Sequence, residues 1–412
     1  MTTEEVVKLI FVGVDWSEDY HDVEVLAEGG QRLGRRRLGT GIEAVRDFEG
    51  LVAEHVDEPK EVVIGIETDR GLFVQALVAA GFVLYAVNPK VVSRYRDRHS
   101  VSGAKSDVGD ARVLADLVRT DRHLHRVVAG DSALAEAVKV VARAHKSLIW
   151  HRQGQIANLR SNLREYYPAA LEAFGEDLGH HDCLAVLERA PTPAAGRALS
   201  HRQLVVALRK GGRQRNLERR AELIGVALRA PQLEAPDLLA EAFGAATTST
   251  VAVISAFDAQ IAALESKLAS AFEEHPDAEI LRSLPGLGAV LGARVLGEFG
   301  DDPSRFADVR ARKNYAGCAP ITRASGKARL VTRRQARNAR LVDALERWAF
   351  CSLRTSAGAR RYYDELRARN KSHNAAIRQL ANRWVGILDG CLRNRRLYDE
   401  EIAWPEPVAL AA

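Results

Sequence analysis

Cysteine is scarce in this 412-residue chain, and the four cysteines are scattered. Cys183, Cys318, Cys351 and Cys391 form no C-x-x-C pair and have no histidine partner at zinc-binding spacing. This arrangement excludes a disulfide framework and a metal knuckle, and it favours a reducing, cytoplasmic setting. No charged segment followed by an apolar one precedes the first strand-like run, so we expect no secretory signal.

Long uncharged runs are also lacking. The stretch that comes nearest to a membrane span, 71–89, is interrupted by Gly81. It predicts a helix over 71–80 and a strand over 82–87 rather than a transmembrane helix. The Walker lysine motif, H-E-x-x-H and G-x-S-x-G are all absent. With 47% hydrophobic residues, the chain is expected to fold around one large core or two to three smaller ones.

Charge is unevenly distributed, although the net charge is only +5. Residues 301–400 hold 23 Lys and Arg against 10 Asp and Glu, whereas the remainder holds 36 against 44. Arginine outnumbers lysine in this basic part, and guanidinium groups bind phosphates in a forked geometry. A single arginine is most often a solvated surface residue, but a basic region of this length predicts a nucleic-acid-facing surface.

The first segment, up to about Arg126, alternates strand and helix signals. Runs at 9–16, 22–26 and 32–39 predict a three-strand meander. There follow a helix over 42–55, a buried strand over 61–67, the helix and strand of 71–88, and a helix from about Asp107. This β-β-β-α-β-α-β-α order is that of the RNase H fold, which brings strand ends and a late helix together around one cleft.

Four carboxylates occupy positions that converge in such a fold. Asp15 and Glu67 end two strand-like runs, and Asp107 and Asp110 are three residues apart, so they share a helix face. Carboxylates of this kind hold Mg²⁺ on either side of a phosphodiester in two-metal phosphoryl transfer. Asp69 is the alternative to Glu67.

Each carboxylate also has an ordinary structural explanation. Asp107 could be a helix N-cap, Asp110 a first-turn residue that interacts with the helix dipole, and Glu67 a strand-end residue. Glu67 favours the metal interpretation, because a carboxylate that ends the apolar run 62–66 is costly to bury unless a cation offsets its charge.

From about Leu134 to Pro276 the pattern is helical. Ile254, Phe257, Ile261, Leu264, Leu268 and Ala271 form one apolar seam; Ile149, Ile156, Leu159, Leu163 and Tyr166 form a weaker one that Arg152 interrupts. The seams could close on each other within one chain or join two chains. Between them, 191–231 is rich in Arg and Gly and is expected to be an inserted helical or loop segment. Its cluster Lys210-Gly-Gly-Arg-Gln-Arg is either a nucleic-acid contact or an exposed turn.

The third segment contains a glycine-rich turn and a serine among cations. Gly286 and Gly288 could form a tight turn before a helix whose free amides bind a DNA phosphate, as in a helix-hairpin-helix. Their spacing to Gly292 is wrong for a dinucleotide loop. Ser325 is expected in a loop beside Arg323. A serine among cations can act as a nucleophile on phosphorus, although a Ser-Gly pair is more often a turn.

Several short motifs occur in order along the chain: Gly13-Val14-Asp15, Glu67-Thr68, Asn88-Pro89, Lys105-Ser106-Asp107 through Asp110-Ala111, Leu284-Pro285-Gly286-Leu287-Gly288, Gly300-Asp301 with Arg305-Phe306, Tyr315 to Pro320, and Ser325-Gly326. Their ordered combination resembles the DEDD transposases of insertion-sequence family one hundred and ten. Asp69 and Arg70 depart from the usual pattern, since small residues are common there, and Cys318 is unusual.

The resemblance implies a three-part architecture. An α/β RNase H-like (RuvC-like) domain would span 1–126, a helical coiled-coil region 127–278, and a mainly α-helical C-terminal transposase domain 279–400, followed by a tail over 401–412. The insert at 191–231 would lie within the coiled-coil region.

The resemblance also implies a mechanism and partners. Asp15, Glu67, Asp107 and Asp110 would be catalytic and hold Mg²⁺, with Mn²⁺ as a substitute, and Ser325 would form a covalent 5′-phosphoserine. The partners would be donor and target DNA, a noncoding RNA encoded beside the gene that guides site choice, and further copies of the chain, as a dimer and as a tetramer at synapsis. No membrane would be involved, and the protein would be bacterial, cytoplasmic and nucleoid-associated.

Basic and glycine residues near these motifs are predicted to contact nucleic acid: Lys105, Gly286, Gly288, Arg305, Lys313, Arg323, Lys327, Arg329, Arg333 and Arg334. Two other functions stay open at this point. One is a metal-dependent junction resolvase that hydrolyses DNA with water and does not need Ser325. The other is a non-catalytic element protein that binds nucleic acid through 301–400.

Overall fold

The chain folds into two compact units. Met1–Ser132 and Asp302–Ala307 form the N-terminal unit, and Ala133–Asp301 and Asp308–Ala412 form the C-terminal unit. The structure is a computed structural model, and it describes residues 8–99, 107–128, 130–326, 328–335 and 337–405.

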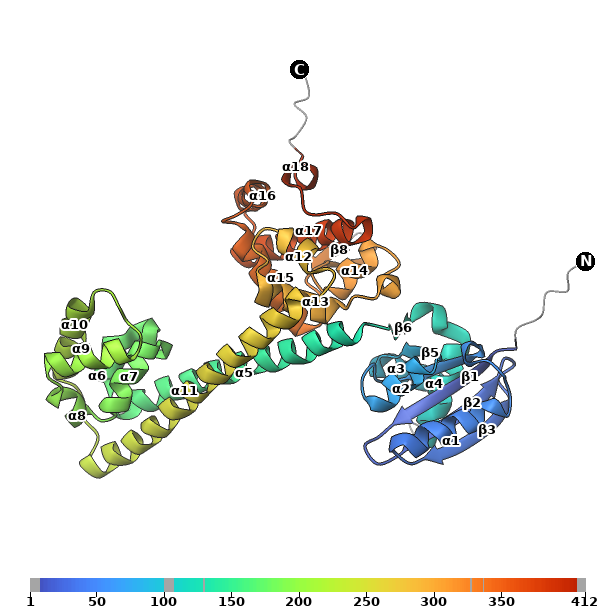
Figure 1. The fold of residues 1–412 in the computed structure, drawn as a ribbon, viewed down its shortest axis with the longest axis horizontal. Coiled ribbons are helices and arrows are strands. Elements are labelled where there is room, and N and C mark those ends of the chain that lie inside the picture. The colour runs from blue at the N-terminus through green and yellow to red at the C-terminus, as the bar shows by residue number, and fades with distance from the viewer. Residues whose placement is uncertain (1–7, 100–106, 129, 327, 336, 406–412) are drawn as a thin grey trace, which may run out of the picture. The chain divides into compact units, whose positions relative to one another are not determined.

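A six-stranded mixed sheet forms the centre of the N-terminal unit (Figure 1). Its strands are β1 Ile10–Trp16, β2 His21–Ala27, β3 Arg32–Leu38, β4 Val62–Ile66, β5 Val83–Ala86 and β6 Arg126–Val127, in the order β3-β2-β1-β4-β5-β6. Strands β1 to β3 form the predicted antiparallel meander, and β4 and β5 run parallel to β1. The short edge strand β6 was not predicted.

Helices cover both faces of this sheet. They are α1 Gly41–Ala53, η1 Pro59–Glu61, α2 Leu72–Ala79, α3 Pro89–His99, α4 Asp107–Asp121 and η2 Arg122–Leu124. Because side chains alternate along a strand, each strand contributes to two separate cores. Val12 and Val14 pack with α1 and α2 on one face, whereas Phe11 packs with α3 and α4 on the other. The uncharged stretch 71–89 contains α2 and β5, as predicted.

A segment from much later in the chain completes the N-terminal unit. Residues 302–307, here called the return segment, include η4 Pro303–Arg305. The backbone amide of Gly130 donates to Asp302 (3.1 Å), and the amide of Asp302 donates to Asp131 (3.3 Å). Arg305 forms an ion pair with Asp131, and the two side chains are only 7% and 2% exposed. The buried charge of Asp131 is therefore balanced by a residue 174 positions away.

Two long helices of the C-terminal unit, α5 Ala133–Tyr166 and α11 Asp237–Glu273, pack along each other (Figure 1). Arg152 donates to Asp258 (2.5 Å), and the hydroxyl of Tyr166 donates to Thr247 (2.8 Å). Residues later in α5 thus contact residues earlier in α11, so the two helices run antiparallel. The helices predicted from the two apolar seams therefore contact each other within one chain. Arg152, which interrupts the weaker seam, forms an ion pair with Asp258 of the other helix.

Among the helices that the structure describes, α11 is long and apolar enough to cross a membrane, by length and composition alone. Such a helix is weak evidence for a membrane span. The bonds of Thr247 and Asp258 to α5 instead give it polar contacts within the unit.

The far end of this helix pair carries a cluster of short helices, here called the helical head (Figure 1). It contains α6 Pro168–Phe174, η3 Gly175–Gly179, α7 His181–Arg189, α8 Pro193–Ala198, α9 His201–Lys210 and α10 Leu217–Arg229. The segment predicted as a helical or loop insert, 191–231, is thus helical, and its apolar side chains share a core with the adjoining ends of α5 and α11.

The remaining elements of the C-terminal unit surround a tryptophan pair. They are α12 Ala278–Ser283, α13 Ala289–Phe299, α14 Val309–Tyr315, β7 Ile321–Ser325, β8 Ala328–Thr332, α15 Ala339–Ser352, α16 Ala357–Ala368, α17 His373–Asn394 and α18 Glu400–Ala403. Trp348 and Trp384 are fully buried, with ring centroids 5.2 Å apart, and they join α15 to α17.

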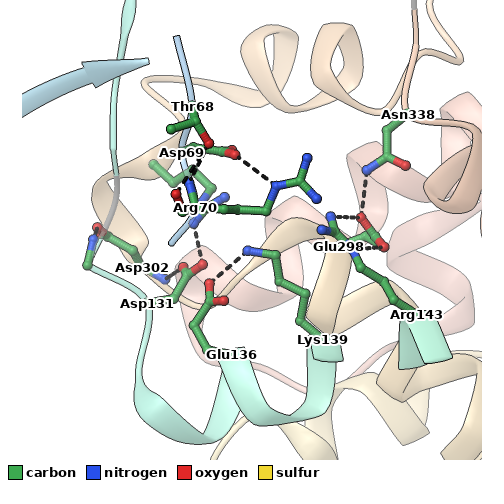
Figure 2. A network of polar contacts seen from close by, with 12 residues as sticks. Thr68, Asp69, Arg70, Asp131, Glu136, Lys139, Arg143, Glu298, Asp302 and Asn338 are labelled. Carbon is green, nitrogen blue, oxygen red and sulfur yellow. Dashed lines mark hydrogen bonds and ion pairs between the residues drawn. The ribbon is translucent and has the colours of Figure 1, made fainter. Parts of the chain in front are cut away.

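A buried glutamate links α13 to α5 and to the start of α15 (Figure 2). Glu298, near the end of α13, is 3% exposed and accepts two hydrogen bonds of 2.8 Å from Arg143 of α5. It also accepts one of 2.6 Å from Asn338, whose own side chain caps α15. Burial acts to raise the pKa of Glu298, but Arg143 and Asn338 more than offset this, so the pKa lies below its ordinary value of 4.5.

We expect Glu298→Gln to destabilise the C-terminal unit by about 2 kcal/mol at pH 7, because Arg143 loses its charged partner. Since the folded pKa is depressed, the wild-type contribution is present above about pH 4.5 and is lost as the pH falls through the folded value. The difference in denaturation midpoint between wild type and variant should therefore shrink in acid. The exposed Glu279→Gln of α12 is the matched control, and an equal loss in both variants would contradict the assignment.

Candidate active site

Asp15 and Glu67 lie at the ends of neighbouring parallel strands. Val14 of β1 pairs with Ile66 of β4, so Asp15 and Glu67 are the next residues along the two strands. By alternation, both belong to the sheet face that carries Phe11 and packs on α3 and α4. Both positions therefore belong to the face on which α4 packs. Glu67 is itself exposed, so the expectation that its charge is buried at the end of the apolar run was wrong: the residue lies just beyond β4, where the chain leaves the core.

Two glycines let α4 approach this face closely. A Cβ atom at Gly13 would lie well inside contact distance of the carbonyl oxygen of Ala111 and 2.5 Å from the amide nitrogen of Ala115. A Cβ atom at Gly65, directly opposite on β4, would lie 2.7 Å from the carbonyl oxygen of Leu114. The absence of side chains at this pair of positions therefore sets how near α4 comes to the strand ends.

Helix α4 carries the other two predicted carboxylates in its first turn. Asp107 is its first residue, and its side chain lies outside the described residues. Asp110 is 6% exposed and forms an ion pair with Arg96 of α3. It immediately precedes Ala111, whose backbone lies against Gly13, so this first turn of α4 packs on β1. The guanidinium of Arg96 offsets the cost of burying Asp110.

Sequence reasoning missed the ion pairs around these carboxylates. Asp22 of β2 lies directly opposite Asp15, is 4% exposed, and accepts two hydrogen bonds from Arg37 (3.0 and 2.7 Å). Arg96, likewise, was not singled out. Two features of the sequence could have indicated these pairs. Several arginines lie in the polar segment just before the motif that contains Asp107, and Asp22 and Arg37 become direct neighbours once the predicted strands 22–26 and 32–39 are paired as a hairpin.

The donor chemistry at this edge suits a hard divalent cation, because Asp15, Glu67 and Asp110 offer carboxylate oxygens. Among the side chains that the structure describes, however, no three His, Cys, Asp or Glu residues gather closely enough to hold a metal ion. The fourth predicted ligand, Asp107, is not among those side chains, and Asp110 is engaged by Arg96.

Ser325 belongs to the C-terminal unit, and its local structure differs from the expected loop. It is the last residue of β7, in a two-stranded antiparallel hairpin with β8, and it is exposed. Arg323 lies two residues earlier and so shares a hairpin face with Ser325. Gly326, at the turn, has φ +54°, a conformation that favours glycine.

Cys318, which lies closest to Ser325 in sequence among the cysteines, is buried. Burial raises the pKa of its thiol to about 12, so the thiol stays protonated at neutral pH. Ser325 is therefore the better candidate for a nucleophile.

The predicted nucleic-acid residues fall into several environments. Arg323, Arg329 and Arg333 are exposed and form no ion pair with another described residue. Arg334 donates to Asn314 (3.4 Å), and Lys313 is half-buried beside Gly386. Lys105 and Lys327 lie outside the described residues.

Two further predictions need a different structural explanation. Arg305 is buried in the ion pair with Asp131, so little of its guanidinium is available to a phosphate. Gly286 has φ +79°, and a Cβ atom there would lie 2.6 Å from the backbone nitrogen of Ser352, so this glycine lets the turn pack on the end of α15. Gly288 precedes α13 as its N-cap and has open space around it.

Comparison with known proteins identifies the family. Residues 12–168 match the profile of the DEDD transposases of IS110 type, and residues 278–364 match that of the IS116/IS110/IS902 transposase family. The chain is 43% identical over 411 residues to the IS117 mini-circle transposase homologue of Streptomyces coelicolor, with 98% of each chain covered. It is 28% identical over 394 residues to an uncharacterized 42 kDa protein of insertion element IS900 from Mycobacterium paratuberculosis, with 94% and 97% covered. The chain therefore belongs to the IS110 family of transposases, proteins that cut DNA and transfer its strands.

Proposed function

We propose that the N-terminal unit is an RNase H-like (RuvC-like) catalytic domain and that the protein recombines donor and target DNA through a covalent serine intermediate. The observation that carries the proposal is the arrangement of carboxylates. Asp15 and Glu67 end adjacent strands on the face covered by α4, and α4 begins with Asp107 and carries Asp110 in the same turn. In the RNase H fold, this strand-end edge is where phosphodiester chemistry takes place.

The four carboxylates would hold Mg²⁺ or Mn²⁺. A bound divalent cation would supply charge to polarise the scissile phosphate and to favour the ionised form of an attacking hydroxyl. Arg96 must then release Asp110, whose carboxylate it now occupies. This exchange of one cation for another keeps the buried carboxylate compensated throughout.

Ser325 would supply the nucleophile. Its hydroxyl oxygen attacks phosphorus and forms an Oγ–P bond, its proton passes to a nearby carboxylate or water, and the P–O3′ bond breaks. The departing 3′ oxygen takes up a proton, which leaves a free 3′-OH and a phosphoserine on the 5′ side. Attack by a 3′-OH of the other duplex reverses these steps and joins the strands. Arg323, on the same hairpin face, would stabilise charge on the phosphate.

The two halves of the chemistry lie in different units of the chain, which favours a composite site with carboxylates from one protomer and serine from another. Such a site requires a homo-oligomer, and two duplexes with two cuts each require a tetramer at synapsis. Recognition of the DNA sites would rest on an element-encoded RNA. The exposed cations Arg323, Arg329 and Arg333 would contact the phosphate backbone.

The test is recombination between a donor plasmid that carries the gene with its natural flanking DNA and a candidate target plasmid. Wild type, Asp110→Ala and Ser325→Ala are compared, and detergent-resistant adducts of protein and DNA are scored with the recombinant junctions. Ser325→Ala should abolish both adducts and junctions without affecting folding, because the side chain is exposed. Ser266→Ala, at an exposed position of α11, is the matched control.

Two outcomes would reject the proposal in different ways. Cleavage that survives Ser325→Ala but not Asp110→Ala would identify a hydrolytic nuclease that uses water. Binding without cleavage by wild type, with the flanking RNA supplied, would identify a non-catalytic nucleic-acid-binding protein.

A further inference from the structure

The helical head contains a cavity of about 720 Å³ that the proposed chemistry does not use. One wall is the corner between η3 and α7, residues 179–182, and a second wall is the turn between α9 and α10, residues 211–215. Arg152 of α5 completes the lining. The space is open to solvent, and its volume falls within the range of about 300–1,000 Å³ that is typical of pockets for small organic ligands, so it has room for a nucleotide.

The turn that forms the second wall depends on glycine. A Cβ atom at Gly211 would lie 2.6 Å from the amide nitrogen of Asp182, so only glycine allows the turn to press on the start of α7. Gly212 has φ +84°, and the amide of Arg213 donates to the carbonyl of Leu208 (3.0 Å), which closes α9 in a Schellman motif. This local structure directs the chain at 213–215 along the cavity.

Carboxylates hold two of the guanidinium groups that line the cavity. Arg152 donates to Asp258 (2.5 and 3.1 Å) and to the carbonyl of Gly179 (2.8 Å). Arg213 donates to Asp182 through Nε alone (2.5 Å). Burial acts to raise the pKa of Asp182, but Arg213 more than offsets this and keeps that pKa below its usual value, so the pair stays charged at neutral pH.

The third guanidinium has no such partner. Arg215 is exposed and forms no ion pair or hydrogen bond with any residue that the structure describes. The surrounding sequence reinforces its charge, because residues 201–220 contain seven Lys and Arg against one acidic residue. The cavity thus combines two fixed guanidinium groups with one that is open to an anion.

We propose that this cavity binds an unpaired nucleic-acid strand, with a backbone phosphate against Arg213 and Arg215 and the adjoining nucleotide in the cavity. Gln214 and the two histidines His180 and His181 offer an amide and flat rings to a base. This assigns the cluster Lys210-Gly-Gly-Arg-Gln-Arg to nucleic-acid contact rather than to an ordinary turn. RNA and single-stranded DNA share the required chemistry.

The inference rests on the proposed function only in taking nucleic acid as the ligand, and photo-crosslinking tests it without any strand cleavage. The full-length protein is irradiated with 20-nucleotide probes that carry 4-thiouridine in RNA or 4-thiothymidine in DNA, and the crosslinked peptides are mapped by mass spectrometry. We expect crosslinks within 179–182 and 211–215. Arg215→Glu should reduce their yield at least about fivefold, since one phosphate contact is replaced by repulsion.

Arg202→Glu is the matched control. Arg202 is exposed at the opposite end of α9 and forms no ion pair with another residue of the described ranges, so the same charge change there should alter the yield less than twofold. Gln214→Ala, which keeps the charge, should lower the yield more moderately. The proposal is overturned if neither probe labels these two segments, if Arg215→Glu leaves the yield unchanged, or if polyglutamate of equal charge competes as well as unlabelled oligonucleotide.

The same measurement on Asp110→Ala separates this inference from the proposed chemistry. Crosslinks should persist in that variant while recombination is lost. If recombination in wild type fails but the head is still labelled, the cavity assignment stands without the catalytic one.

Discussion

Gly13→Ala is expected to destabilise the N-terminal unit by at least about 3 kcal/mol and to abolish recombination. The new methyl group would overlap the backbone of Ala111, which cannot move away as a flexible side chain would. Helix α4 must therefore shift off the sheet, and Asp110 moves with it, away from Asp15. Chemical denaturation followed by circular dichroism measures the first effect, and the recombination assay measures the second.

Gly50→Ala is the control for this substitution. Gly50 lies in α1, and a Cβ atom there meets nothing within 4 Å. Alanine is the better helix former by about 1 kcal/mol, so this variant should be as stable as wild type or slightly more so. A Gly13→Ala protein with wild-type stability and activity would show that α4 does not need the close approach.

Asp15→Asn is expected to leave the fold intact and to lower DNA strand cleavage about a thousandfold, which corresponds to about 4 kcal/mol of transition-state stabilisation. Asparagine keeps the size of the side chain but removes the charge that would hold a divalent cation beside Glu67. The fold should be retained, because the amide oxygen of asparagine can still accept hydrogen bonds. Single-turnover cleavage measures the loss of activity, calorimetric titration with Mn²⁺ measures the loss of cation binding, and circular dichroism checks that the fold is intact.

Asp19→Asn provides the comparison for this loss. Asp19 is an exposed residue in the connection between β1 and β2, four positions from Asp15, and the same chemical change there should leave cleavage and Mn²⁺ binding unaltered. If Asp15→Asn cleaves at a rate within tenfold of wild type, the carboxylate is structural and the metal assignment fails.

Apolar runs were a good guide to the central strands. Runs such as Val62–Ile66 are long enough to be buried on both faces, so they predicted a sheet core that the structure confirms. Helix α3 and strand β6 were missed because α3 is strongly polar, with few apolar positions, and β6 has only two residues. The pairing that holds such elements depends on the rest of the fold, and local sequence does not record it.

In the candidate site, too, local features were predicted from the sequence, whereas contacts between distant elements were not. The positions of Asp15 and Glu67 follow from where strands end, which is a local property, and parallel pairing then makes them neighbours. The ion pair between Arg96 and Asp110 joins two helices. Sequence spacing alone could not show which of the neighbouring arginines would reach Asp110. Ser325 was expected in a loop, because β7 and β8 are exposed on both faces and so lack the apolar alternation that marks a strand.

The return segment has a consequence for how this protein can be divided or recombined. Any N-terminal fragment that stops before residue 302 leaves the nearly inaccessible carboxylate of Asp131 without Arg305. A chimaera that exchanges the sheet-containing half with a relative must therefore carry two pieces of chain, one from either side of the helical excursion. A single crossover within 133–301 would take Asp131 from one parent and Arg305 from the other, so the two residues must be inherited together although that whole stretch separates them in the sequence.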